Sequence, residues 1–446
     1  MTHEPLNQLD EQKLNRLHWK MVFTAGMGFF TDAYDLFIIG VVTTLLLPIW
    51  HLSLWQLSLL NGASLAAAAF GAILFGYFAD RFGRKKMYGI EILILFVGAI
   101  ASALSPNYNC LLIARMLVGF GIGGDYPTSA VIASEHSNRK NRGFLVLMVF
   151  AMQALGLVFG PMLASLLLVV HLPHAWIWRL LLGFGALPAA SVYFLRRKIA
   201  ESPRYLLNKE LPFEGGRAVD ELAQPDQAIV IAKKPSLFCK PWGKYLIGTA
   251  GAWFLLDIVF YGNAVSSSFI MHSINKQGSL LMHTLIACAL FLVFAVPGYF
   301  LAAKFVDKLG RKLLQMLGFG MIAVCYALIA IPFIQGSMLI FILIFGLSFF
   351  FVNFGPNSTT FLIPSEIYPT NIRARAHGFS AATGKIGAFL GAFCLPLFLK
   401  TFGLGVTMSA LSLLALLGIL VTRLLPERMG ASLEVAEQFN HFIQDS

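Results

Sequence analysis

The chain has 446 residues, of which 57% are hydrophobic and only 12% are charged. A soluble domain carries about a quarter charged residues, so this composition excludes a protein whose surface faces water. Runs of about 20 apolar residues recur along nearly the whole chain, and such runs are long enough to cross a bilayer. We therefore predict an all-α, polytopic membrane protein.

The net charge of +11 does not indicate nucleic-acid binding, because the basic residues are spread along the chain. They recur in short clusters between alternate apolar runs, at residues 81–86, 137–143, 195–198, 304–312 and 371–375. The loops between them are almost free of Lys and Arg, which is the pattern of the positive-inside rule. We expect both termini in the cytoplasm, a multi-pass position in the cell (plasma or inner) membrane, and the lipid bilayer as a partner.

In chain order, the apolar runs predict about twelve spans. They start near residues 20, 55, 87, 108, 143, 175, 241, 281, 312, 337, 373 and 404. One long polar stretch divides them into two sets of six. It predicts an N-terminal half of residues 1–197, a cytoplasmic linker of residues 198–239 and a C-terminal half of residues 240–446.

The two halves carry related sequences. GYFADRFGRKK follows the second span and AKFVDKLGRK follows the eighth, so Asp80 aligns with Asp307 and Arg84 with Arg311. These loops resemble the signature of the major facilitator superfamily. The resemblance implies two pseudo-symmetric six-helix halves, with these four residues holding helix ends and closing the cytoplasmic side.

A second repeat joins the fourth and tenth spans, which end in a Ser-Glu pair at Glu135 and at Glu366. We assign both glutamates to the same cytoplasmic gate. Tyr126 and Asn357 stand at the same distance before these glutamates. Parallel six-span halves with a site at their interface are typical of major facilitator transporters.

Charged residues stand inside several apolar runs. They are Asp32 and Asp35 in the first span, Arg115 and Asp125 in the fourth, Asp257 in the seventh and Lys385 in the eleventh. A charge at mid-bilayer costs roughly 2.5–3.5 kcal/mol, so we expect these side chains to face a cavity or one another. A buried structural ion pair explains Arg115 equally well.

The glycines of VGFGIGG, residues 118–124, are spaced like a dinucleotide-binding motif. That motif requires a preceding strand, whereas this stretch lies in a predicted membrane span. We therefore expect these small residues to serve close helix packing.

Span seven reads TAGAWFLLDIVFYGN, which places Trp253, Asp257 and Tyr261 on one stripe of a helix. The stripe offers an indole donor, a carboxyl group and a phenol. A belt of aromatic residues at the membrane interface explains Trp and Tyr but not the Asp between them. We predict that the stripe lines a substrate site, to which Gln153 in span five adds an amide.

Proline interrupts two symmetry-related spans beside polar residues. Gly355-Pro356 precedes Asn357 in span ten, and Pro127 follows Tyr126 in span four. Proline removes a backbone donor, so we expect a break in both helices. Broken helices near mid-membrane are the sequence sign of a binding site in transporters.

The polar residues of the predicted substrate site combine hydrogen-bond donors with acids, and Lys385 supplies a positive charge. A sugar site needs fewer acids, and a cation site needs fewer donors. Dihydrogen phosphate fits a site that has both donors and acids, because its oxygens accept hydrogen bonds and its P–OH groups donate to a carboxylate. Sulfate lacks such a proton near neutral pH and leaves the carboxylate unpaired.

GGDYPTSAVIASE, FFTDAYDLF, WFLLDIVFY, FGPNSTTF and AATGK resemble signatures of the phosphate:H⁺ symporter family of the major facilitators. The resemblance extends over both halves. It implies phosphate contacts from Tyr126, Gln153, Trp253, Asp257, Tyr261 and Asn357, and a functional role for Lys385. It also implies proton coupling by Asp35 and Asp125, with Asp35, which shares a helix with Asp32, as the first candidate for the proton carrier.

We therefore predict a transporter that takes up inorganic phosphate with protons by alternating access and acts as a monomer. A symporter for a sugar, an organophosphate or an organic acid, and a receptor that binds phosphate without moving it, stay open as alternatives. No nucleophile–base set stands out, so we expect no enzyme. The five cysteines are scattered without disulfide or metal-ligand spacing, and we expect neither a metal nor a cofactor.

Overall fold

The computed structural model of the chain describes residues 10–199, 201–208, 236–267, 270–271 and 278–433. Within these ranges, every regular element is a helix. The first group comprises α2 (Arg16–Trp50), α3 (Leu54–Phe82), α4 (Arg84–Ala103), α5 (Tyr108–Glu135), α6 (Arg142–Val169), α7 (His174–Phe184) and α8 (Ala186–Arg196). The short helix α9 (Pro203–Asn208) follows. The second group comprises α11 (Trp242–Val265), α13 (Leu280–Leu290), η1 (Phe291–Ala295), α14 (Val296–Leu309), α15 (Arg311–Ile329), α16 (Pro332–Gln335), α17 (Met338–Phe354), α18 (Pro356–Ile367) and α19 (Arg373–Thr422).

These helices form the twelve predicted spans. Ten helical stretches are long and apolar enough to cross a membrane, and α5, with charged residues in its apolar run, is the eleventh. The twelfth arises because α19 bends at Gly403, whose φ of 77° is outside the helical range. A glycine adopts this conformation without steric cost, and the bend separates the two predicted spans that start near residues 373 and 404.

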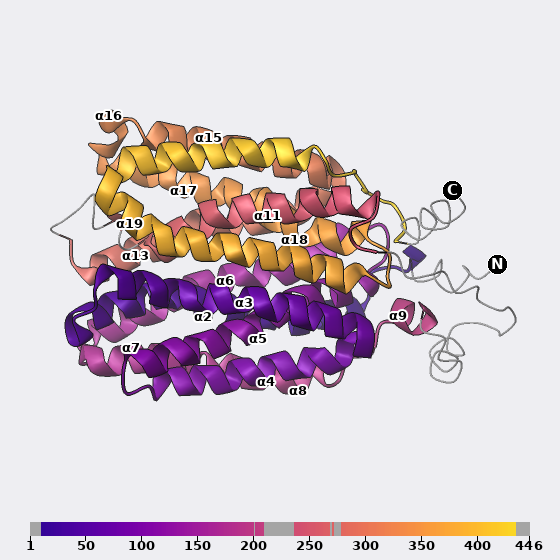
Figure 1. The fold of residues 1–446 in the computed structure, drawn as a ribbon, viewed down its shortest axis with the longest axis horizontal. Coiled ribbons are helices and arrows are strands. Elements are labelled where there is room, and N and C mark those ends of the chain that lie inside the picture. The colour runs from indigo at the N-terminus through magenta and orange to yellow at the C-terminus, as the bar shows by residue number, and fades with distance from the viewer. Residues whose placement is uncertain (1–9, 200, 209–235, 268–269, 272–277, 434–446) are drawn as a thin grey trace, which may run out of the picture.

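The two groups lie side by side with their helices along the long axis of the molecule (Figure 1). Helices α3 and α6 pack across the interface, α3 against α19 and α6 against α13 and α14. The Ser432 hydroxyl donates to the Asp10 carboxylate over 2.8 Å, which brings both described ends of the chain together. We call this end of the bundle, which also carries α9 and Glu135, the terminal face. Most of the predicted linker of residues 198–239 lies outside the described residues.

Proline has different effects on the spans. Span ten breaks at Gly355 as predicted, where α17 ends and α18 begins. Span six also divides, into α7 and α8, because Pro188 has no N–H for the carbonyl of residue 184. The predicted break at Pro127 was wrong, since α5 continues through it. The carbonyl that Pro127 leaves without its helical N–H partner is that of Gly123, and a membrane helix tolerates this where a neighbouring helix packs against it, as α3 does at Ala68.

The glycines of residues 118–124 serve close packing between α5 and α3. A Cβ atom at Gly119 would overlap the carbonyl oxygen of Ser64, and one at Gly123 would overlap that of Ala68. The backbones of α5 and α3 are in direct contact here, so neither position can hold a side chain. The predicted packing role of this motif is confirmed.

We expect Gly119→Ala to destabilise the protein by about 1–3 kcal/mol, because the added methyl group forces α5 away from α3. The effect is measured as a lower melting temperature of the purified protein in detergent. Gly320→Ala is the matched control, since a Cβ at Gly320 meets only the Ile419 side chain, at 3.8 Å. Equal melting temperatures of the two variants would contradict the packing role.

Candidate functional site

The structure brings all seven predicted substrate residues together between the two helix groups. Each is at most 4% exposed. They come from α5 (Tyr126), α6 (Gln153), α11 (Trp253, Asp257, Tyr261), α18 (Asn357) and α19 (Lys385). We call this set the central cluster.

Hydrogen bonds join the central cluster across the interface between the groups. The Lys385 ammonium donates to the Tyr261 hydroxyl over 2.9 Å. The hydroxyls of Tyr261 and Tyr126 lie 3.3 Å apart, and the Gln153 amide donates to Tyr126 over 3.4 Å. The indole of Trp253 lies against the Tyr126 ring, with centroids 6.0 Å apart.

Tyr299 of α14 completes this chain and was missed by the sequence analysis. Its hydroxyl donates to the Gln153 amide oxygen over 3.1 Å and accepts from the Asn357 amide over 2.8 Å. It thereby links the two helix groups a second time. Its signal in the sequence was a lone phenol in the apolar run that precedes Asp307.

The positive and negative charges of the central cluster lie on neighbouring helices. The Lys385 ammonium is 3.3 Å from the Asp257 carboxylate and 4.2 Å from the centre of the Tyr126 ring. The second carboxylate oxygen of Asp257 has no hydrogen-bond partner among the described residues. This oxygen can therefore accept a hydrogen bond from a ligand, beside the Trp253 side chain, which also interacts with the Asp257 carboxyl.

Aromatic rings close the central cluster along the helix axes in both directions. Towards the terminal face, Phe150 of α6 stacks on Phe361 of α18 with centroids 4.4 Å apart, and Phe29 of α2 contacts both rings. Towards the opposite end, Phe37 of α2 stacks on Tyr261 at 5.2 Å. A ligand in the cluster is thus separated from both ends of the bundle.

The three predicted proton-coupling acids lie in the first helix group and have different surroundings. Asp35 pairs with Arg115 over 3.5 Å and faces Gly185, where α7 gives way to α8. Asp125 pairs with Arg196 over 2.5 Å. Both carboxylate oxygens of Asp32 lack a hydrogen-bond partner among the described residues.

Asp32 interacts electrostatically with charged residues of both helix groups. It interacts with Asp125 and Arg196 and with Tyr126 and Lys385 of the central cluster. Asp35 and Asp125, by contrast, make their hydrogen bonds and ion pairs inside the first helix group. Of the three acids, Asp32 is the one without a counter-ion in direct contact.

Arg196 is a buried partner that the sequence analysis counted only as a member of the basic cluster at residues 195–198. Its guanidinium bonds Asp125 and, over 2.9 Å, Glu91 of α4. It is 1% exposed and lies 3.9 Å from the ring centre of Tyr88. Gly28 makes room for it on α2, since a Cβ there would overlap its guanidinium.

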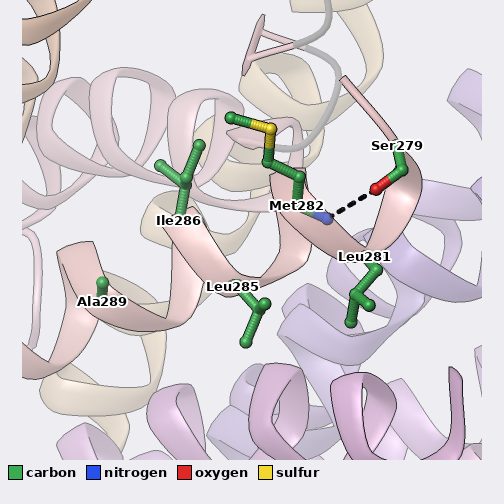
Figure 2. Close-up of a pocket in the computed structure, with 6 residues that line it drawn as sticks. All are labelled: Ser279, Leu281, Met282, Leu285, Ile286 and Ala289. Carbon is green, nitrogen blue, oxygen red and sulfur yellow. Dashed lines mark hydrogen bonds between the residues drawn. The ribbon is translucent and has the colours of Figure 1, made fainter. Parts of the chain in front are cut away.

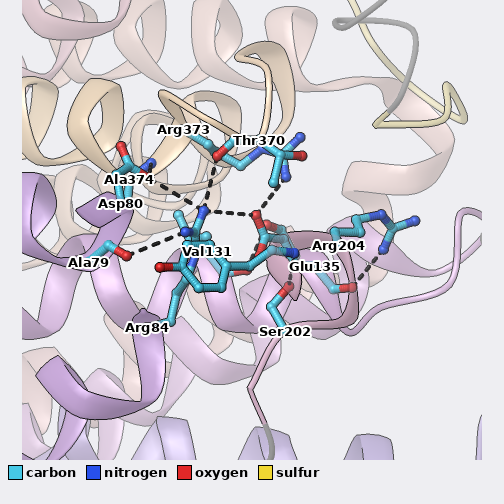
Figure 3. Close-up of polar contacts among 12 residues, drawn as sticks. Ala79, Asp80, Arg84, Val131, Glu135, Ser202, Arg204, Thr370, Arg373 and Ala374 are labelled. Carbon is cyan, nitrogen blue, oxygen red and sulfur yellow. Dashed lines mark hydrogen bonds and ion pairs between the residues drawn. The ribbon is translucent and has the colours of Figure 1, made fainter. Parts of the chain in front are cut away.

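The six predicted gate residues form two clusters at the terminal face. In the first, the Asp80 carboxylate accepts from the backbone N–H groups of Ala374 and Arg375, which start α19 of the other group. Arg84 bonds both Glu135, over 3.4 Å, and the carbonyl of Thr370. Figure 3 shows this cluster.

The gate contains two further charges from the second group, Arg373 and Arg375, and the latter lies 3.5 Å from the Asp80 carboxylate. Arg373, which the sequence analysis assigned to a basic cluster, is buried and bonds Glu135 over 2.8 Å. In the second cluster, Asp307 accepts from the backbone N–H of Phe144 at the start of α6. Arg311 there makes a two-pronged bond to Glu366, over 2.9 and 2.8 Å. Each group thus caps a helix of the other, and the terminal face is closed.

A separate pocket of about 350 Å³ lies on α13 (Figure 2). Its lining is apolar except for Ser279, whose hydroxyl already accepts from the Met282 backbone N–H over 3.1 Å. This pocket offers no charged group for a polar ligand. The central cluster is therefore the candidate functional site.

The fold is that of a major facilitator. It matches the major facilitator proton:xylose symporter XylE with a TM-score of 0.77, at 19% identity, over 95% of this chain and 98% of that one. The chain belongs to the Sugar (and other) transporter family, whose model matches residues 21–439.

Within that family, the chain resembles inorganic phosphate transporters. It is 36% identical to the probable inorganic phosphate transporter 1-6 of Arabidopsis thaliana, over 96% of this chain and 95% of that protein. It is 34% identical to the low affinity inorganic phosphate transporter 8 of Medicago truncatula, over 97% and 92% of the two chains.

We expect Tyr299→Phe to weaken phosphate binding about 10-fold, because it leaves the amides of Gln153 and Asn357 without their shared partner. Phosphate affinity of the purified protein, measured by isothermal calorimetry, checks this. Tyr326→Phe is a control, because the Tyr326 hydroxyl bonds Asn263, outside the central cluster. Unchanged affinity in Tyr299→Phe would exclude Tyr299 from the site.

Proposed function

We propose that the protein is a proton-coupled transporter that takes up inorganic phosphate as dihydrogen phosphate. The central cluster carries this proposal: it combines an ammonium, phenols and amides with one carboxylate oxygen that lacks a partner. The phosphate oxygens accept from the donors, and a P–OH group donates to Asp257. The similarity to inorganic phosphate transporters over nearly the whole chain supports the same substrate.

Residues 1–197 and 240–446 are proposed to rock about the central cluster, with residues 198–239 as their linker. Alternating access of this kind moves the substrate unchanged. The gate clusters at the terminal face then separate to release phosphate. Because the basic clusters lie at this face, we assign it to the cytoplasm of a cell (plasma or inner) membrane, with the monomer as the working unit.

For the proton carrier, the contacts favour Asp32 over Asp35. A buried carboxylate without a donor or counter-ion is costly when ionised, so protonation stabilises Asp32 in the closed state. Asp35 already has the charge of Arg115 beside it. Asp32 also interacts electrostatically with Lys385 of the central cluster, where the charge of phosphate arrives.

Uptake of labelled phosphate into proteoliposomes, with and without an inward proton gradient, tests this function. We expect uptake that rises with the gradient and is inhibited by unlabelled phosphate but not by equal sulfate, xylose or glycerol 3-phosphate. Inhibition by the sugar or the phosphate ester would favour the alternative symporters. Binding without any uptake would favour a receptor.

A further inference from the structure

We propose that a cavity between α4 and α8 at the terminal face binds the headgroup of an anionic phospholipid. The cavity has a volume of about 590 Å³. Four of its lining residues are basic, namely Lys85, Lys86, Arg196 and Arg197, and none is acidic. It is distinct from the central cluster, with which it shares no residue.

The charges at the mouth of this cavity are available to a ligand. The side chains of Lys85, Lys86 and Arg197 are exposed, and none forms a salt bridge in the part of the chain that the structure describes. The nearby acid, Glu201, is bound instead to the backbone N–H groups at the start of α4, at 3.1 and 3.2 Å. Several positive charges around one pocket favour a phosphate group, which carries negative charge and accepts several hydrogen bonds.

The inner wall of the cavity adds Arg196, whose Nε–H has no hydrogen-bond partner among the described residues. Its other two nitrogens bond Asp125 and Glu91. A buried guanidinium N–H without a partner is costly. An anion in the cavity would reduce this cost by adding negative charge beside Arg196.

The apolar part of the cavity favours a lipid over a free phosphate ion. Ile90 and Leu93 line it and are 47% and 50% exposed. They follow Lys86 along α4 by one and two helical turns, so Leu93 lies about 10 Å deeper than Lys86 along the helix. Charge at the mouth and apolar side chains below it match the order of headgroup and acyl chain in a bilayer, and basic pockets between spans on the cytoplasmic side bind such headgroups.

The repeat-related place in the second helix group does not offer the same site. Lys312, which aligns with Lys85, donates to the carbonyl groups of Arg423 and Leu425, both over 3.0 Å. Its ammonium is therefore engaged with the end of α19. The internal repeat thus predicts a basic loop in both halves, but Lys312 is engaged with backbone carbonyls, whereas Lys85 lines a cavity.

Native mass spectrometry of the purified full chain with phosphatidylglycerol, against phosphatidylcholine, tests this inference. We expect the wild type to retain phosphatidylglycerol selectively, and Lys85→Gln/Lys86→Gln to weaken its binding about 10-fold or more. Lys304→Gln/Lys308→Gln is the matched control, since it removes the same charge from exposed lysines near the end of α14, in the repeat-related motif. Equal loss in both double variants would overturn the site, because it would mean diffuse attraction.

Gly89→Leu tests the space in the cavity independently of its charge. A Cβ at Gly89 meets only the Tyr193 ring, at 4.0 Å, so a leucine fills the cavity and keeps every basic residue. We expect this variant to lose phosphatidylglycerol while it keeps the wild-type melting temperature without lipid. Undiminished lipid binding would overturn the proposal.

A competition experiment distinguishes binding of the lipid from binding of soluble phosphate. We expect inorganic phosphate and glycerol 3-phosphate, at millimolar concentration, to leave bound phosphatidylglycerol in place. Displacement by either in the wild type would overturn the lipid assignment and indicate a second site for soluble phosphate. None of these readouts involves transport, so failure here is distinguishable from failure of the proposed function.

Discussion

Asp257→Asn is expected to lower phosphate affinity about 10- to 100-fold and to reduce the preference for phosphate over sulfate. A hydrogen bond to a charged group is worth roughly 1.5–3 kcal/mol, and the carboxylate oxygen of Asp257 without a partner is the acceptor that a P–OH group needs. An amide at this position also presents a donor, which suits the aprotic oxygens of sulfate. Calorimetry with both anions, on the same purified variant, measures the two effects together.

A double variant separates two roles of Asp257, the acceptor for phosphate and the counter-ion of Lys385. Asp257→Asn/Lys385→Gln has the same net charge as the wild type, so any effect of an unpaired ammonium disappears. We expect the double variant to bind phosphate more weakly than Asp257→Asn, because it also loses the ammonium donor of Lys385. Recovery of affinity would show that Asp257 acts only by balancing Lys385.

Asp32→Asn is expected to abolish the response of phosphate uptake to a proton gradient. The amide has the shape of the protonated acid but cannot exchange a proton, and Asp32 has no hydrogen bond among the described residues that the substitution would break. We therefore expect folding and phosphate–phosphate exchange to persist. Proteoliposomes with labelled phosphate, assayed for uptake under a pH gradient and for exchange without one, give both readouts.

Asp35→Asn is the control on the same helix, and it differs in mechanism. It removes the counter-ion of Arg115, which is fully buried, and breaking such a pair typically costs about 3–5 kcal/mol. We expect a lower melting temperature and loss of both uptake and exchange. If Asp32→Asn retains gradient-driven uptake while a stable Asp35→Asn loses only the gradient response, the carrier is Asp35, as the family resemblance implies.

Much of the architecture could be predicted from one sequence. The starts of the spans followed from apolar runs, and the largest difference is at α2, which starts at Arg16 rather than near residue 20. The gate residues followed from a repeat, because equal positions in related halves meet around the same axis. The stripe of Trp253, Asp257 and Tyr261 followed from helix periodicity, which is a local property of the chain.

Other features depended on contacts between helices. The prediction of a break at Pro127 was wrong because the effect of a proline on a membrane helix depends on the groups that pack against the backbone around it. The sequence places Arg196 and Arg373 in basic clusters at helix ends. A run of Lys and Arg does not indicate which of its side chains is buried. Their burial is explained by their contacts with acids on neighbouring helices, which only the tertiary structure shows.

The sequence by itself determined the class of the protein, its twelve spans, its internal repeat and the membership of most of the central cluster, because these follow from composition, periodicity and spacing along the chain. Only the tertiary structure decided the partners of the buried charges. Arg115 lies beside Asp35, Arg196 beside Asp125, and Asp32 beside neither. The physical reason is that helix rotation and packing set the distance between side chains on different spans, and a difference of a few ångströms separates a structural ion pair from an acid that is free to carry a proton.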